Sequence, residues 1–502
     1  MYWLSVLIFL PLSGALVVGL TGRFSATSVR WIALAITVAE LLIALGLWWS
    51  ASPDPNGYLY IVQAPWIPIM GIQFLLGMDG LSLLLVLLTA LLVPIAILVS
   101  WNSIRHNWPT FAALVLTTQA GIMGVFLALD LILFYVFWEL MLVPMYFLIA
   151  LWGHERRLYA AYKFFLFTVT GSLLMLVAIL GLYFIHGEQT GIYTFNYFEL
   201  LHTNLPGNTG MWLMLGFFVA FAVKIPLFPI HSWLPDAHTE APTAGSIILA
   251  GLLLKTGAYG LLRFCLPLFP EASVDFAPFA MVLGVIGILY GALLALVQED
   301  MKRLIAYSSI SHLGFVVFGI YAWNQEGLHG AMLLMLAHGV TTSAMFAIVG
   351  MLEERVDTRL LPCMGGLLAP MPRMGAMLLL FTLSAMGMPG LANFVGEFLV
   401  LAGVYQVSAG LAIAGAMGVV ASAIYLLWMY QRAMLGELSS EHAWSDLDHR
   451  EMLILGLLAI TVLWLGLYPA PFLNYLQVPA SVIIELNTAT LVGIEDALRR
   501  SD

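Results

Sequence analysis

LILFYVFWELMLVPMYFLIA, residues 131–150, is a run of apolar side chains that contains a single charged residue, Glu139. A helix of about 20 such residues is long enough to cross the hydrocarbon core of a bilayer. The whole 502-residue chain shares this character, because 62% of its residues are hydrophobic and only 9% are charged. A soluble domain carries about 25% charged residues, so we predict that most of this chain is surrounded by lipid.

Fourteen apolar segments of sufficient length follow one another along the chain. They lie near residues 3–20, 31–50, 79–100, 110–129, 131–151, 161–185, 212–230, 241–264, 276–298, 302–322, 328–350, 374–405, 409–432 and 452–470. The polar stretch 471–502 is expected to form a surface helix. The predicted fold is therefore all-α, a polytopic membrane protein of about 14 transmembrane helices.

The basic residues are distributed unequally between the two ends of these segments. One side receives thirteen of the 18, namely Arg23, Arg30, Arg105, Arg156, Arg157, Lys163, Lys302, Arg303, Arg355, Arg359, Arg373, Arg432 and Arg450. The other side receives Arg263, Arg499 and Arg500. Because Lys and Arg are enriched in cytoplasmic loops, we predict a multi-pass protein of a bacterial inner membrane with both termini on the periplasmic side.

Six titratable residues fall inside six different predicted spans. They are Glu139, Lys224, Lys255, His312, His338 and Glu397. Each charge at the centre of a bilayer costs about 2.5–3.5 kcal/mol on insertion scales, so such residues need a function or a partner. Burial disfavours the charged form of both lysine and glutamate, which makes proton exchange between them feasible. Two lysines, two glutamates and two histidines are typical of a proton relay.

Other interpretations of single residues stay open at this point. Any one of the six could be a structural ion pair or a buried hydrogen bond, and Glu139 with Lys224 could simply dock two helices. His312 and His338 could ligate a haem axially. Glu40, a seventh intramembrane charge, is interpreted as a helix-packing or subunit-interface residue rather than a relay member.

The loop HSWLPDAHTEAP, residues 231–242, concentrates polar side chains. His231, Asp236, His238 and Glu240 are metal ligands in type, but their spacing matches no known site. We interpret the loop as a polar vestibule on the inner side. Two cysteines are too few for a disulfide framework or an iron–sulfur cluster, and no basic patch suited to nucleic acid is present. No metal site is predicted.

Prolines and glycines interrupt two of the spans. Pro226 and Pro229 follow Lys224 directly, and Pro389 and Gly390 precede Glu397. Paired broken helices in two halves of a chain are typical of inverted-repeat transporters. We therefore divide the chain into N-terminal helices 1–3, a first five-helix repeat, a second, inverted five-helix repeat, and a last helix with its tail, at 1–109, 110–264, 276–432 and 433–502.

Four long stretches resemble the antiporter-like, proton-translocating membrane subunits of NADH:quinone oxidoreductase, the respiratory complex I. They are WELMLVPMYFLI (138–149), AVKIPLFPIHSWLPDAHTEAPTAGSIILAGLLLKTGAYGLLRF (222–264), QEDMKRLIAYSSISHLGF (298–315) and GMPGLANFVGEF (387–398). Within the family, Glu397 matches one type of subunit, whereas the sister L- and N-type subunits resemble each other in carrying a lysine there. The resemblance covers nearly the whole chain and is weakest in 1–75 and 435–502.

The resemblance implies a role for each of the six residues. Glu139 and Lys224 are expected to form the pair of a first half-channel, and Lys255 is the connecting lysine of a central axis. His312 and His338 continue the polar line, and Glu397 is the terminal site of a second half-channel. The chain itself is expected to bind no cofactor, because flavin, iron–sulfur clusters and quinone belong to partner subunits. Its expected partners are other membrane-arm subunits, especially the L- and N-type, together with lipid and protons.

Three other functions compete with a translocase subunit of this oxidoreductase. The first is a cation/proton antiporter of the Mrp type, or a subunit of a membrane-bound hydrogenase, which shares these repeats. The second is a structural membrane scaffold, which would not need internal charges. The third is a membrane enzyme with its own active site, but the sequence has no nucleophile, metal or phosphate-loop motif.

Overall fold

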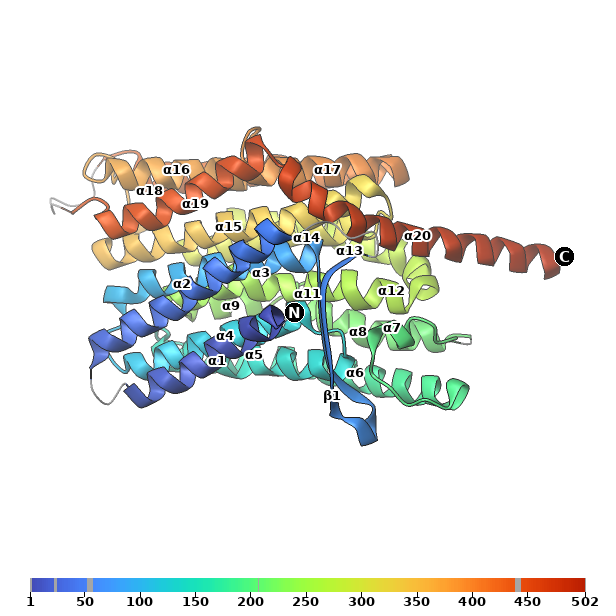
Figure 1. Ribbon diagram of the computed structural model, residues 1–502. Helices are drawn as coiled ribbons and strands as arrows, with labels where there is room; N and C mark the ends of the chain where they lie inside the picture. The colour runs from blue at the N-terminus through green and yellow to red at the C-terminus, as the bar shows by residue number, and fades with distance from the viewer. Residues whose placement is uncertain (1, 22–24, 52–56, 206, 438–443, 502) are drawn as a thin grey trace.

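A computed structural model describes residues 2–21, 25–51, 57–205, 207–437 and 444–501, and shows helices lying side by side in one bundle (Figure 1). Within these residues, twelve helical segments are long and apolar enough to cross a bilayer. They are α1 (Trp3–Thr21), α2 (Ala26–Ser50), α3 (Gly80–Ser103), α4 (Trp108–Leu127), α5 (Leu131–Trp152), α6 (Arg157–Thr190), the composite segment Thr243–Leu268, α13 (Pro270–Leu296), α14 (Met301–Ile320), α15 (Gln325–Val356), α18 (Ala409–Met434) and α19 (His449–Leu467). The predicted polytopic helical fold is confirmed, while the count of fourteen remains a prediction.

Two of the fourteen expected spans, the seventh and the twelfth, are not among the twelve long helical segments, because each is interrupted. The seventh is represented by α8 (Thr209–Lys224), which α9 (Trp233–Glu240) follows, and the twelfth is divided into α16 (Pro372–Ala385) and α17 (Ala392–Val407). Helix α8 ends at Lys224, just before Pro226, since proline supplies no backbone donor and clashes with the preceding turn. The second interruption covers residues 386–391. Both predicted breaks are confirmed.

The eighth expected span is helical throughout, yet its winding changes along its length. It consists of α10 (Thr243–Ile248), the π-helical η2 (Leu249–Leu253), α11 (Leu254–Gly260), the π-helical η3 (Leu261–Cys265) and α12 (Leu266–Leu268). Short π-helical turns inside α-helices occur frequently at functional sites. The sequence pattern indicated a uniform helix here, because apolar periodicity does not register a change of winding.

Corresponding helices of the two predicted repeats pack in the same order. Helix α4 packs on α5 as α13 packs on α14, and α6 packs on α8 and α9 as α15 packs on α16 and α17. Helix α3 is mostly buried and contacts α4, α10 and α15, so that it runs between the two groups. This packing agrees with two five-helix repeats, which remain a prediction.

A β-hairpin accompanies the helices of the confirmed helical membrane fold. Strands β1 (Tyr58–Ile67) and β2 (Ile72–Asp79) pair antiparallel, joined by the short η1 (Pro68–Met70). The hairpin extends beyond the helices in the lower part of Figure 1. Gly71 closes its turn in the left-handed region at φ 69°, where a side chain would also collide with the Tyr193 carbonyl. The hairpin lies between the second and third expected spans, where no helix was predicted.

The expected surface helix at 471–502 is present as α20 (Ala470–Ser501), which extends past the bundle toward the C-terminus (Figure 1). Short helical turns, α7 (Tyr197–Leu200) and η4 (Leu361–Cys363), lie in connecting segments. Arg23, Arg499 and Arg500, which enter the orientation argument, lie outside the residues whose side chains the structure describes. The orientation therefore remains a prediction.

Helices α15 and α17 approach closely at glycines, which permits a test of the packing. A methyl group on Gly330 would lie 2.5 Å from the Val400 amide nitrogen and 2.8 Å from the Gly396 carbonyl oxygen. We expect Gly330→Ala to separate the helices and to destabilise the protein by about 1–3 kcal/mol, the usual cost of overpacking. The measurement is the apparent melting temperature of the purified protein in detergent.

Gly456 supplies the matched control, because no heavy atom lies within 4 Å of a methyl group placed there. Gly456→Ala should leave the melting temperature unchanged or raise it slightly, since alanine favours a helix over glycine. Equal melting temperatures for Gly330→Ala and the wild type would show that the backbones are not in close contact.

Candidate functional site

Lys255 and His338 form the centre of the candidate site. Both residues are completely buried, and the Lys255 Nζ atom lies 2.7 Å from the His338 Nδ1 atom. Lys255 also donates a hydrogen bond of 2.5 Å to the carbonyl oxygen of Ala250, which belongs to η2. The site thus joins α11 to α15 at the π-helical turn. Two donated hydrogen bonds partly replace the water that the ammonium group loses on burial.

A second pair continues the line from His338. The imidazole rings of His312 and His338 are 5.7 Å apart between centroids, and His312 Nδ1 lies 3.0 Å from a carboxylate oxygen of Glu397. His312 and Glu397 are both almost fully buried. The four residues come from α11, α15, α14 and α17. The structure therefore brings together four of the six predicted residues in one polar line.

The break between α16 and α17 lies against the Glu397 end of this line. Gly387 in the break has φ 76°, and a methyl group placed on it would lie 2.5 Å from a Glu397 carboxylate oxygen. Glycine is suited to this position because it adopts positive φ and lets the backbone approach the carboxylate. The interrupted helix thus brings polar backbone groups next to a buried acid, which agrees with its predicted place at a transport site.

Glu139 and Lys224 are neighbours that do not touch. Lys224 is buried with no hydrogen-bond partner for its Nζ atom, which lies 5.2 Å from the centroid of the Trp138 ring. Glu139 is half-buried, with one carboxylate oxygen buried and unpartnered. The two side chains form no ion pair within 4.0 Å, although Glu139 interacts electrostatically with Lys224. The expected pair is thus adjacent but open, and its role stays a prediction.

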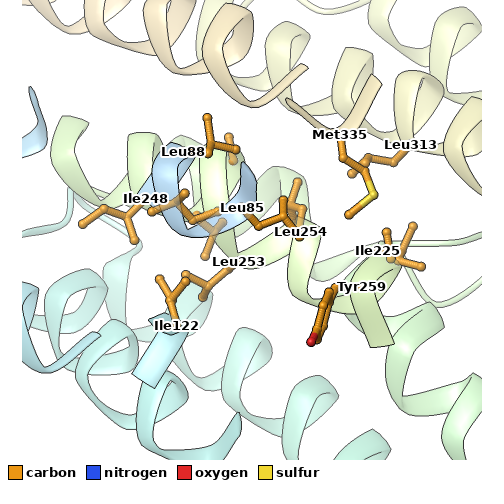
Figure 2. Close-up of a cluster of buried hydrophobic side chains, with 14 of the residues drawn as sticks. Leu85, Leu88, Ile122, Ile225, Ile248, Leu253, Leu254, Tyr259, Leu313 and Met335 are labelled. Carbon is orange, nitrogen blue, oxygen red and sulfur yellow. The ribbon is translucent and has the colours of Figure 1, made fainter. Parts of the chain in front are cut away.

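A buried apolar cluster includes the residues next to Lys224 and Lys255 in the chain. Ile225, Leu254, Leu313 and Met335 belong to it, and Figure 2 shows their side chains between the surrounding helices. All four are buried. Because the Lys224 Nζ atom has no hydrogen-bond partner, proton transfer from Lys224 to the central line requires water to enter or a side chain to move.

The polar loop 231–242 does not form a metal site. Asp236 pairs with Lys163 at 2.7 Å, Glu240 accepts a hydrogen bond of 2.8 Å from the Arg156 backbone amide, and His238 stacks on Phe346. Over the described part of the chain, no group of three or more His, Cys, Asp or Glu residues is placed to hold a metal ion. His312 and His338 contact Glu397 and Lys255 through their Nδ1 atoms, and their Nε2 atoms are buried without a hydrogen-bond partner.

Sequence reasoning missed a cluster of ion pairs at the basic end of the bundle. Lys302 was counted as a loop cation, but it is completely buried and pairs with Glu353 at 3.0 Å. Arg359 joins Asp300 at 2.5 Å and Glu353 at 3.3 Å. Burial and the nearby Lys302 cation lower the pKa of His154 to about 4, so its imidazole is neutral at pH 7. The charged run QEDMKR before a span was the available signal.

A second missed cluster lies at the opposite end, where Arg263 was also counted as a loop cation. Arg263 forms an ion pair with Asp79 and donates hydrogen bonds to the hydroxyls of Tyr58 at 3.0 Å and Tyr259 at 3.2 Å. Asp79 precedes the third span, and its pairing with a residue 184 positions later left no local signal. Contacts of that separation become visible only in the folded chain.

Glu40 has no partner for either carboxylate oxygen, although it is completely buried in α2. It lies on α2, which packs mainly on α1, α3 and α4, although Leu41 of α2 and Leu336 of α15 line a common cavity. Glu40 itself forms no hydrogen bond with the polar line, and its interpretation as a packing or interface residue stays open.

Comparison with known proteins gives a consistent result. Residues 128–424 match the family described as NADH:quinone oxidoreductase/Mrp antiporter, transmembrane. The chain is 49% identical to the NADH-quinone oxidoreductase subunit M of Pseudomonas aeruginosa, over 98% of this chain and 97% of that protein. It is 41% identical to the NADH-ubiquinone oxidoreductase chain 4 of Arabidopsis thaliana, over 96% and 97%.

Solved structures agree with these relatives. A chain of the respiratory complex I of Thermus thermophilus superposes with a TM-score of 0.88 at 33% identity, covering 96% of this chain and 99% of that chain. A chain of the Mrp complex of Dietzia sp. superposes with a TM-score of 0.86 at 20% identity, covering 98% and 99%, and at that identity the likeness shows the fold alone.

Proposed function

The chain belongs to the NADH:quinone oxidoreductase/Mrp antiporter family, in the group of subunit M and mitochondrial chain 4, and from this premise we propose that it is a proton-translocating membrane-arm subunit of NADH:quinone oxidoreductase. It takes part in a translocase whose redox chemistry occurs in partner subunits. The observation that carries this proposal is the buried line of Lys255, His338, His312 and Glu397, in which neighbouring side chains can exchange a proton.

Each residue of this line has its own proposed role in proton transfer. Lys255 is the central proton-binding site, and its contact with the His338 ring allows the proton to leave along the line. His312 receives the proton from His338 through a short displacement or a bridging water, since their rings are adjacent but not bonded. Glu397 accepts it next to the broken helix, where water can enter from one surface. Glu139 and Lys224 load the system from the first half.

The gap between Lys224 and Glu139 supports a switching role for this pair. A lysine that is buried without a hydrogen bond is easily deprotonated, whereas an ion pair with Glu139 would hold its proton. Closing and opening the pair would therefore change the proton affinity of Lys224. A change of this kind is a way for a signal from partner subunits to reach the central line.

The position of Glu139 supports a partner at this edge of the bundle. Glu139 is only half-buried, and its neighbours Val136 and Val143 are 41% and 46% exposed. A carboxylate facing lipid in mid-membrane is costly, so another membrane-arm subunit is expected to cover it. We propose the L- or N-type antiporter-like subunits. The bacterial inner membrane, with both termini on the periplasmic side, completes the proposal.

Lys224 provides the experiment that tests the relay. Arginine keeps a positive charge but does not release its proton in a protein. We expect Lys224→Arg to assemble and to pump clearly less than the wild type, while retaining more activity than Lys224→Ala. The measurement is NADH-driven acidification by the purified complex in proteoliposomes.

Lys163→Arg is the matched control, since Lys163 lies outside the line and its pairing with Asp236 tolerates arginine. Full pumping by Lys224→Arg would show that Lys224 contributes only a positive charge and does not itself take up and release a proton. A scaffold without a relay predicts full pumping for every variant that assembles.

A further inference from the structure

The polar cluster around Arg263 lies on the same helical segment as Lys255. Tyr259 follows Lys255 by one turn and Arg263 by two, about 12 Å along the axis at 1.5 Å per residue. Residue 241, just before this segment begins, lies at the opposite, basic end, because its carbonyl oxygen is 3.5 Å from the Lys302 Nζ atom. A line from Lys255 through Tyr259 to Arg263 therefore leads toward the end of the bundle that carries few basic residues.

Side chains that could pass a proton follow this line almost to the surface. Arg263 contacts Tyr259, Asp79 and Tyr58. Tyr58, Asp79 and Arg263 line a cavity of about 110 Å³ together with Val478 and other residues of α20. The Arg263 side chain is 10% exposed. With water in it, this route would connect Lys255 directly to that surface and bypass Glu397.

Three features close the route in this structure. The Tyr259 hydroxyl donates to the Phe126 carbonyl oxygen at 3.0 Å, accepts from Arg263 Nε at 3.2 Å, and lies 3.2 Å from the Ser82 hydroxyl. Its hydrogen-bonding positions are thus filled and it cannot turn toward Lys255. Leu85, Ile122 and Leu254 are buried, and Figure 2 draws them in the same apolar cluster as Tyr259.

The third feature is the fixed charge of Arg263. An arginine stays protonated in a protein, and a fixed positive charge in a narrow passage excludes protons. Asp79 holds this charge in place, since it pairs with Arg263 and also accepts a hydrogen bond of 2.8 Å from the Ser82 amide at the start of α3. The hydroxyl of Tyr259 and the charge of Arg263 occupy successive turns of the helical segment between Lys255 and the surface, beside the buried apolar cluster.

We propose that Tyr259, Arg263 and Asp79 form a proton barrier that separates Lys255 from the nearer membrane surface, so that its proton leaves only along His338, His312 and Glu397. The inference rests on the proposed function, in which Lys255 carries a proton. A pump cannot let a loaded site reach both surfaces at once, because the proton would then return down its gradient. Tyr259, Arg263 and Asp79 act as positioning residues and are not relay members.

Two variants test the barrier. Arg263→Gln removes the fixed charge and leaves the Asp79 carboxylate free to accept a proton. Tyr259→Phe keeps the ring but loses the hydroxyl contacts. We expect both to raise the passive proton conductance of the assembled complex in proteoliposomes by about tenfold, equivalent to about 1.4 kcal/mol of barrier. Fewer protons should be pumped per NADH oxidised, while NADH oxidation in the presence of an uncoupler persists.

Combining each variant with Lys255→Met makes the test specific, because a leak through Lys255 must then disappear. Arg355→Gln is the matched control. It breaks another ion pair, with Glu451 at 2.5 Å, between α15 and α19, and should leave conductance at the wild-type value. Equal leak in Arg355→Gln, or a leak that survives Lys255→Met, would overturn the barrier and indicate general loosening.

The remaining outcomes also decide the matter. If Arg263→Gln does not assemble, Tyr259→Phe alone tests the barrier, and wild-type conductance and coupling in the assembled Tyr259→Phe complex would refute it. Lys255→Met alone should abolish pumping. If pumping persists in Lys255→Met, the proposed function of Lys255 fails, whereas unchanged conductance in the Arg263 and Tyr259 variants refutes the barrier and leaves that function intact.

Discussion

Glu139→Ala is expected to reduce NADH-driven proton pumping by about 100-fold or more, the usual contribution of a positioned proton-transfer group, while the complex still assembles. Without the carboxylate, the buried Lys224 ammonium, which has no hydrogen-bond partner, loses its nearest opposite charge. The first half of the relay then has no site that holds a proton beside Lys224. Quinone reduction should fall with pumping, because the two processes are coupled.

Glu139→Asp should be milder, since it keeps the acid and only shortens its reach. Glu40→Gln is the control, because Glu40 is another intramembrane carboxyl that forms no hydrogen bond with the line and should leave pumping near the wild-type rate. Proton uptake and NADH:quinone turnover are measured in membranes with equal amounts of assembled complex. Near-wild-type pumping by Glu139→Ala would remove Glu139 from the relay.

A double variant of Glu139→Ala with Lys224→Ala should lose less pumping than the sum of the two single losses if the residues interact.

Glu397→Gln is expected to lower pumping and quinone reduction together, by about 100-fold, because it removes a proton-transfer group. Glutamine is nearly isosteric and can keep the contact with His312 Nδ1, which is 3.0 Å in the structure, but it cannot take up a proton. The proton on His312 then has no acceptor at the broken helix. The blocked exit should also slow the loading of Lys255 through the two histidines.

Glu397→Lys should retain more activity than Glu397→Gln, since lysine restores a titratable group at the same place and is the residue that the resemblance assigns to the sister subunits. Both variants are compared by proton translocation and turnover at equal assembly. If Glu397→Gln pumps like the wild type, then Glu397 serves only to hold His312, and the proton must leave elsewhere.

Much of the fold followed from residue order alone. The span predicted at 131–151 is α5, Leu131–Trp152, because a bilayer requires about 20 apolar residues in succession. The break after Lys224 was equally visible, since Pro226 cannot continue a helix. The hairpin of β1 and β2 was missed because its stability depends on pairing between strands and on packing against the helices, which no span pattern records.

The candidate site was predictable only as a set of residues. Charge inside an apolar segment identified Lys255, His338, His312 and Glu397 one by one, because each such charge is costly in lipid. Which of them touch was not predictable, since His338 lies 83 positions from Lys255 and Glu397 lies 85 from His312. Contact across helices depends on the rotation and approach of each helix.

The sequence by itself determined that this chain is a membrane-spanning helical protein with broken helices and titratable groups in mid-membrane, because the cost of moving charge and unpaired backbone into lipid is a property of composition and local order. Only the tertiary structure decided that four of these groups form one line and that Glu139 and Lys224 stand apart. It alone revealed that Arg263 and Lys302 are paired ions and not loop cations. The physical reason is that hydrogen bonds and ion pairs act over about 3–4 Å, and only the packing of distant helices brings side chains within that range.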